Sequence, residues 1–223
     1  MMKSHTVTIL IAIIVMTVSA GTSVAEKASG LNLELFNAAE NGDLAKVKLL
    51  TEKGADVNAR TTDDVEDGTV LMIASRMGHL DMVKSLVEKG ADVNARTTGD
   101  VEGGTALMNA SGMGHLDVVK FLVEKGADVN AVATGDVEGG SATVLIIAAD
   151  GGHLDVVKLL IENGADVNAA NKEGKTAQYY AIRSVKTEVS DYTKTLLKYN
   201  PFTCKSYAEY WGQPPILYLT GPL

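Results

Sequence analysis

The chain has 223 residues, enough for one or two domains, with 46% hydrophobic and 22% charged residues. This composition is ordinary for a globular protein and argues against a disordered chain. The net charge of −8 gives no indication of binding to nucleic acid or to an anionic membrane. A single cysteine, Cys204, excludes an intramolecular disulfide framework and a cysteine-rich metal site.

Residues 1–25 are typical of a secretory signal peptide. Lys3 precedes an apolar run over residues 9–16, and Ser23-Val24-Ala25 fits the small-x-small pattern of a cleavage site. Val18-Ser19-Ala20 is a second candidate site. The alternative is an uncleaved anchor, but a membrane-spanning helix needs about 18 or more apolar residues. We therefore expect an exported protein, periplasmic or secreted, that has no stable membrane insertion after cleavage.

Internal repeats follow a short linker at 26–30 and organise residues 31–198. The string Gly-Ala-Asp-Val-Asn-Ala starts at positions 54, 90, 126 and 164, which gives spacings of 36, 36 and 38 residues. Between these strings run Gly-His-Leu-Asp and Thr-x-Leu, each at three places and always in the same order. A period of this size indicates stacked supersecondary units.

Each unit is predicted to contain two short helices. The first begins at Thr69, Thr105 or Thr143, whose hydroxyl can accept a hydrogen bond from a free backbone N–H. A glycine ends each of these helices, at Gly78, Gly114 and Gly152. The second helix, over residues 80–89 in one unit, carries an apolar stripe made of Leu80, Val83, Leu86 and Val87. Neither helix can bury its apolar face alone, so the units must stack.

These motifs resemble the ankyrin repeat, over about residues 31–198. The resemblance implies an all-α ankyrin-repeat solenoid of about five helix-turn-helix units with elongated hairpin loops. Two features depart from the family pattern. The family's usual histidine after Thr-x-Leu is replaced by Met72, Met108 and Ile146, which predicts a drier contact. The period also exceeds the family's 33 residues or so, because the loops that the resemblance identifies as projecting hairpin fingers are longer.

The fingers, at residues 61–68, 97–104 and 133–140, are acidic. One interpretation is a negative strip that attracts a basic partner and speeds association. A second is a solvated edge without a function. A third is a site for calcium or another cation or small ligand, although Ca²⁺ requires 6–8 oxygen ligands and each loop offers few carboxylates.

No catalytic constellation is found, and we expect neither an enzyme nor a cofactor. His79, His115 and His153 occur once per unit, so they would lie about 10 Å apart along the stack. One zinc ion would need all three within about 2 Å, so no metal site is predicted. By resemblance, these histidines hydrogen-bond neighbouring backbone in the turns.

The predicted function is a non-catalytic scaffold that binds another protein with a basic surface, and not nucleic acid. By resemblance, the fingers and the exposed face of the first helices form the concave recognition surface. The candidate partner-binding residues lie there: Arg60, Asp63, Asp64, Glu66, Asp67, Arg76, Met77, Arg96, Asp100, Glu102, Met113, Asp136, Glu138 and Asp150.

Residues 199–223 differ in composition from the repeats. All four prolines of the chain and six of its eleven aromatic residues lie in this segment. Two hypotheses stay open. The segment is a cap that covers the apolar end of the last unit, or it is a docking segment, since aromatic residues dominate interface anchors.

Overall fold

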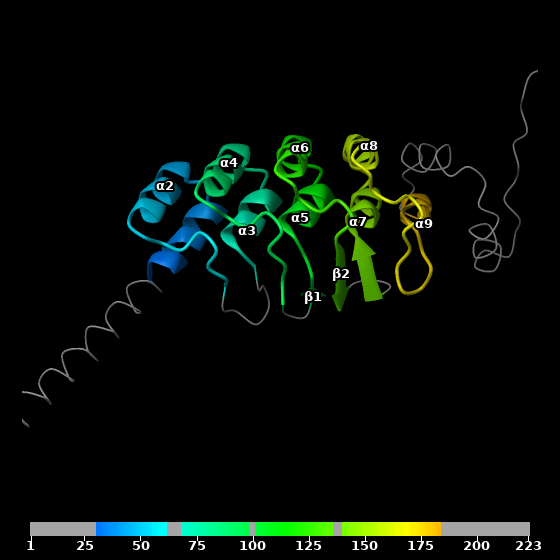
Figure 1. Cartoon of the computed structure of the whole chain (residues 1–223), viewed down its shortest axis with the longest axis horizontal. Coiled ribbons are helices and arrows are strands. Elements are labelled where there is room, and N and C mark those ends of the chain that lie inside the picture. Colours follow the sequence, from blue (N-terminus) through cyan, green and yellow to red (C-terminus); the bar gives the residue numbers. More distant parts are fainter. Residues whose placement is uncertain (1–29, 62–67, 99–100, 136–139, 184–223) are drawn as a thin grey trace, which may run out of the picture.

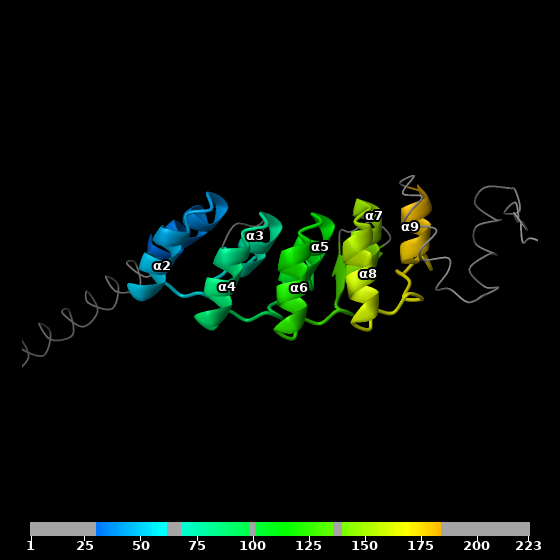
Figure 2. The ribbon, with the colours of Figure 1, turned by 90° about the horizontal axis from the view of Figure 1, so that it is seen from above.

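The fold is a stack of helix pairs, seen here in a computed structural model that describes residues 30–61, 68–98, 101–135 and 140–183. The helices form two rows, and the segments that join successive pairs project away from the rows on one side (Figure 1). Seen from above, neighbouring pairs stand side by side along the long axis (Figure 2). The predicted solenoid is confirmed. None of the helices that the structure describes has the length and apolarity needed to span a bilayer.

We call the row nearer the projecting segments the inner helices and the other row the outer helices. The inner helices are α3 (Val70–Arg76), α5 (Ala106–Gly112), α7 (Val144–Gly151) and α9 (Ala177–Arg183). The outer helices are α2 (Leu44–Glu52), α4 (Leu80–Glu88), α6 (Leu116–Glu124) and α8 (Leu154–Glu162). A further helix, over residues 30–40, precedes α2. Residues 1–29 and 184–223, which contain the predicted signal peptide and C-terminal tail, lie outside the described residues.

The inner helices begin where the sequence predicts. The side chains of Thr69, Thr105 and Thr143 accept hydrogen bonds from the backbone N–H three residues later, at 3.4, 3.2 and 3.1 Å. The glycine that follows each helix has a positive φ, 74° at Gly78 for example, a conformation that costs glycine little. A side chain there would also collide with the next unit, because a Cβ on Gly78 would lie 2.6 Å from Nδ1 of His115.

The core is a continuous aliphatic layer between the two rows. Its largest fully buried side chains include one leucine from each of several helices, such as Leu71, Leu107 and Leu145 in the inner row. The residues that replace the family's histidine, Met72, Met108 and Ile146, are buried at 2–3% exposure. Met72 still takes part in a hydrogen bond, because its Sδ accepts from the Thr69 N–H at 3.5 Å.

The buried stripe of α4 is wider than the sequence predicts. Val83 and Leu86 are buried as expected, and Leu80 and Val87 are half-buried, but Met82 and Ser85 are also buried. The reason is that α4 contacts three neighbours, since it packs on α3 in its own unit and lies between α2 and α6. A helix enclosed on three sides buries more than one stripe.

Hydrogen bonds from asparagine side chains join successive units at the Gly-Ala-Asp-Val-Asn-Ala turns. The side-chain amide of Asn94 donates to the Gly126 carbonyl at 3.0 Å, and its oxygen accepts from the Asp128 N–H at 2.9 Å. Asn58 and Asn130 make the same pair of bonds to the units that follow them. Each turn therefore fixes the position of the next turn along the stack.

Two fingers pair with each other, which the sequence analysis does not anticipate. β1 (Val101–Glu102), β2 (Val132–Gly135) and β3 (Ser141–Thr143) form an antiparallel sheet in the order β1-β2-β3. Val101 pairs with Gly135, and Ala133 pairs with Ala142. The finger that contains β2 and β3 belongs to the 38-residue spacing, so it is two residues longer than the preceding finger.

Candidate functional site

Half of the predicted partner-binding residues lie outside the described residues, so their placement stays a prediction. These are Asp63, Asp64, Glu66, Asp67, Asp100, Asp136 and Glu138. The other half fall into two groups. Arg60 and Arg96 each lie immediately before a finger and Glu102 lies within one. Arg76, Met77, Met113 and Asp150 lie at the C-terminal ends of inner helices.

The two finger arginines make inter-unit hydrogen bonds. A guanidinium N–H of Arg60 donates to the carbonyl of Arg96, and one of Arg96 donates to the carbonyl of Val132. Both side chains are exposed and reach the next finger 36 residues along the chain. They therefore order the fingers relative to one another, a role that the sequence analysis did not assign to them.

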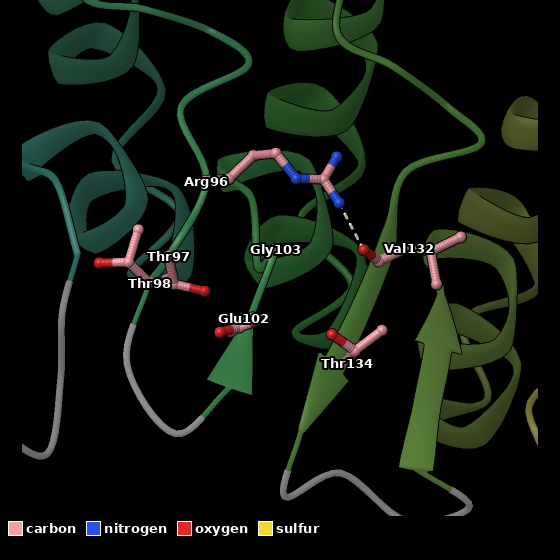
Figure 3. Close-up of a pocket in the computed structure, with 7 residues that line it drawn as sticks. All are labelled: Arg96, Thr97, Thr98, Glu102, Gly103, Val132 and Thr134. Carbon is pink, nitrogen blue, oxygen red and sulfur yellow. Dashed lines mark hydrogen bonds between the residues drawn. The ribbon is translucent and has the colours of Figure 1, made fainter.

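Arg96 and Glu102 come together in one open hollow of about 350 Å³ between two fingers. Figure 3 shows the Arg96 side chain reaching across toward Val132, with Glu102 and Thr134 below it and Gly103 between. The other lining residues are Thr97 and Thr98. Apart from Arg96 and Glu102, none of these residues was predicted from the sequence to bind a partner. The Thr-Thr pair that begins two of the fingers, at 61–62 and 97–98, is the sequence feature from which the two threonines of the hollow could have been predicted.

A backbone bulge shapes the hollow. The Thr97 N–H donates to the Gly104 carbonyl, while the Thr97 carbonyl accepts from the Gly103 N–H, so one residue faces two. Gly103 has a φ of 81°, as expected for the left-handed glycine of a β-bulge. A Cβ there would lie 2.7 Å from the Val132 carbonyl oxygen. It would also lie 2.6 Å from Nη2 of Arg96. Position 103 therefore requires glycine, because the Arg96 guanidinium and the Val132 carbonyl occupy the space that a side chain would need.

Two methionines stand out on the inner helices. Met77 and Met113 follow α3 and α5 at equivalent positions, and they are 45% and 56% exposed. Arg76 is half-buried, and its carbonyl accepts a hydrogen bond from His115. Asp150 lies 3.7 Å from the guanidinium of Arg183 on α9, so it contacts the next unit. The structure thus places two exposed apolar side chains at equivalent positions of adjacent units, on a surface that also carries charges.

The histidines have the structural role that the resemblance implies, with one exception. Nε2 of His115 lies 2.9 Å from the Arg76 carbonyl oxygen, and Nε2 of His153 lies 3.0 Å from that of Gly112. Nε2 of His79 is buried and has no hydrogen-bond partner among the described residues. His79 faces the turn of the first unit at Gly42. In that turn Asp43 follows the glycine, whereas a histidine follows it in the later units.

The described residues contain no group of three or more His, Cys, Asp or Glu side chains that could hold a metal ion. Most of the finger carboxylates lie outside these residues, so the calcium interpretation stays an untested prediction.

Among the residues that the structure describes, Lys175 in the last unit has a strongly shifted pKa. The hydrogen bond from Lys175 to Glu173, at 2.7 Å, raises the pKa of Lys175 to about 12. Its ammonium also lies 4.8 Å from the ring centre of Tyr179. These contacts order the turn before α9 and place a permanent cation there at neutral pH.

The comparison with known families agrees with this geometry. Residues 35–133 and 134–206 match the family of ankyrin repeats (3 copies). No curated protein matches the sequence. The chain belongs to the ankyrin-repeat family, whose members are generally non-catalytic protein–protein interaction modules.

Proposed function

We propose that the protein is a scaffold that binds a partner protein with a basic surface through the inner-helix ends and the fingers. The observation that carries the proposal is the pair of exposed methionines, Met77 and Met113, on adjacent inner helices. Methionine is flexible and polarisable and adapts well to a partner surface. Neighbouring exposed apolar side chains rimmed by polar residues are typical of protein interaction sites.

The frame that holds these side chains supports the proposal. The hydrogen bonds of Asn58, Asn94 and Asn130 fix successive turns, and those of Arg60 and Arg96 fix successive fingers. A surface that is ordered before binding loses little conformational entropy when the partner arrives, which favours affinity.

The charge of the fingers supports a basic partner. The chain carries a net charge of −8, and the finger sequences repeat Asp-Val-Glu at 64–66, 100–102 and 136–138. Of these carboxylates, the structure describes that of Glu102, which is exposed. We propose that the fingers steer the partner electrostatically, which raises its association rate more than its final affinity.

Capture of the partner tests the proposal. The protein is immobilised, exposed to an extract of its source organism, and the bound proteins are identified by mass spectrometry. The double variant Met77→Gln, Met113→Gln should lose the dominant basic partner. Leu49→Gln is the matched control, because Leu49 is 48% exposed on the outer helix α2, and it should keep that partner. Equal capture by both variants would refute the inner-helix site.

We also propose that the partner is met outside the cytoplasm, as the sequence of residues 1–25 indicates. Amino-terminal sequencing of the protein from its source cells should give Glu26 as the first residue, or Gly21 if the second candidate site is used. A cytoplasmic protein that still begins at Met1 would contradict export and would leave the binding proposal untouched.

A further inference from the structure

We infer that Met77 and Met113 form a reversible oxidation site, at which hydrogen peroxide converts two exposed thioethers to sulfoxides and thereby releases the partner protein. The site itself depends on the exposure and the chemistry of the two side chains. Its effect on binding rests on the proposed function, because that function places the partner on the same two methionines.

The five methionines that follow residue 25 differ sharply in exposure. Met77 and Met113 are 45% and 56% exposed, whereas the other three are 1–3% exposed, namely Met72, Met82 and Met108. Oxidation requires contact between the sulfur and the oxidant. A buried methionine makes that contact only in locally open conformations, which are minor states populated at about 10% or less. Peroxide should therefore oxidise the two exposed sulfurs first.

The exposed apolar side chains of the two helix rows differ in chemistry. On the outer row, Leu49 of α2 and Leu116 of α6 are exposed, and a leucine has no sulfur to oxidise. Among the described residues, the exposed large apolar side chains at the inner-helix ends are Met77 and Met113. The apolar contact that the protein offers to its partner is therefore the one that an oxidant can change.

The reaction is a two-electron oxidation of each sulfur. A sulfur lone pair attacks one oxygen of hydrogen peroxide, and an S–O bond forms as the O–O bond breaks. The hydroxide that leaves takes the proton of the new S–OH group, which gives a sulfoxide and one molecule of water. The product is a polar, chiral side chain in place of a flexible apolar one. A partner surface that fits the thioether then has to bury a polar S–O group, which is unfavourable without a hydrogen bond.

The fold does not depend on the two thioethers. Each of these methionines is the C-cap residue of its helix, and the backbone N–H of Met77 donates to the carbonyls of Ile73 and Ser75. These hydrogen bonds belong to the main chain and remain when the sulfur is oxidised. An exposed sulfoxide is also accessible to methionine sulfoxide reductases, which reverse the reaction. Oxidation therefore changes the surface and leaves the solenoid folded.

Peptide mass spectrometry tests the selectivity of the site. The purified protein is treated with hydrogen peroxide, quenched, denatured and digested with trypsin. Two tryptic peptides each contain one exposed and one buried methionine: Met77 with Met82 in residues 77–84, and Met113 with Met108 in residues 97–120. Fragment ions locate the added oxygen within each peptide. We expect the exposed methionine to be oxidised at least about tenfold faster than the buried one, and equal rates would overturn the inference.

The effect on binding is measured with the dominant protein that the untreated scaffold captures. The oxidised scaffold should bind this protein about tenfold more weakly or less, while its thermal transition is unchanged. Methionine sulfoxide reductases A and B with a thiol reductant should restore binding. The reductant alone should not, although it reverses oxidation of Cys204 to a sulfenic acid or a disulfide. Unchanged binding after oxidation, loss of the thermal transition, or full recovery with the reductant alone would overturn the inference.

Leu49→Met supplies a matched control, because Leu49 is 48% exposed on the outer helix α2. In the free variant, the introduced methionine should be oxidised about as fast as Met77. In the complex with the captured protein, the introduced methionine should still react, whereas Met77 and Met113 should be protected. Equal oxidation of all three in the complex would show that the partner does not cover the inner-helix ends.

The outcome is separable from that of the proposed function. If the double variant Met77→Gln, Met113→Gln loses the partner while the oxidised wild type keeps it, only the oxidation site is ruled out. If the double variant keeps the partner, the inner-helix site fails and the effect of oxidation on binding fails with it, whatever the peptide spectra show.

Discussion

Replacing Asn94 by alanine removes the contacts that join two adjacent turns in the middle of the stack. The side chain makes two inter-unit hydrogen bonds, one to the Gly126 carbonyl and one from the Asp128 N–H. The turn of Asn94 itself is kept, because its backbone N–H still donates to the Asp92 carboxylate at 2.9 Å. The perturbation therefore acts on the interface between units and leaves the turn in place.

The expected loss follows from the number of bonds. Each intramolecular hydrogen bond contributes about 0.5–1.5 kcal/mol net, so two of them predict a loss of about 1–3 kcal/mol in the free energy of unfolding. For a domain of this size about 1 kcal/mol corresponds to roughly 2–4 °C in Tm, so we expect Tm to fall by about 2–12 °C. Because a solenoid is stabilised by nearest-neighbour interfaces, the transition should also broaden.

The assay is thermal and urea unfolding followed by circular dichroism, together with hydrogen exchange at the Asp128 amide. Asn168→Ala is the matched control, since Asn168 occupies the same place in its turn and makes no inter-unit hydrogen bond within the described residues. It should change stability by less than about 0.5 kcal/mol. Equal stability losses in the two variants, or unchanged exchange at Asp128 in Asn94→Ala, would refute the reasoning.

Two further predictions concern buried or titrating side chains. The hydroxyls of Ser75 and Ser111 are fully buried without a hydrogen-bond partner among the described residues, and the equivalent residue of the next unit is Ala149. Ser75→Ala and Ser111→Ala should therefore stabilise the fold by about 1 kcal/mol in urea unfolding, and a loss of stability would contradict this. The pKa of Lys175 is raised from 10.5 to about 12 by its bond to Glu173. The stability that this bond gives the folded state is therefore fully present below pH 10.5 and is lost as the pH rises through 12. The difference in urea midpoint between the wild type and Glu173→Gln should accordingly be present at pH 9 and shrink above pH 10.5, and a difference that stays constant would contradict the assignment.

The sequence predicts those parts of the fold that depend on local chemistry. The threonine caps, the left-handed glycines and the buried aliphatic layer follow from residue types at helical spacing, and the structure confirms them. The histidine turns follow from the family resemblance and are confirmed for His115 and His153.

The features that sequence reasoning misses depend on how successive units are placed in space. The inter-unit bonds of Asn94 and Arg96 link residues more than 30 positions apart, and a single unit gives no indication of them. The recurrence of a polar residue at the same place in every Gly-Ala-Asp-Val-Asn-Ala string was a usable signal. The finger sheet pairs strands from two different fingers, and no local propensity encodes that pairing. The hollow near Gly103 is lined in part by residues of β1 and β2, which belong to that sheet.

The measurement that most directly tests the account is a hydrogen-exchange footprint of the protein with its captured partner. Binding at the proposed surface should slow amide exchange at residues 76–78 and 112–114 and along the finger at 97–104, while the outer helices α4 and α6 exchange as in the free protein. Protection confined to the outer helices or to residues 199–223, with no change at the inner-helix ends or the fingers, would contradict the account.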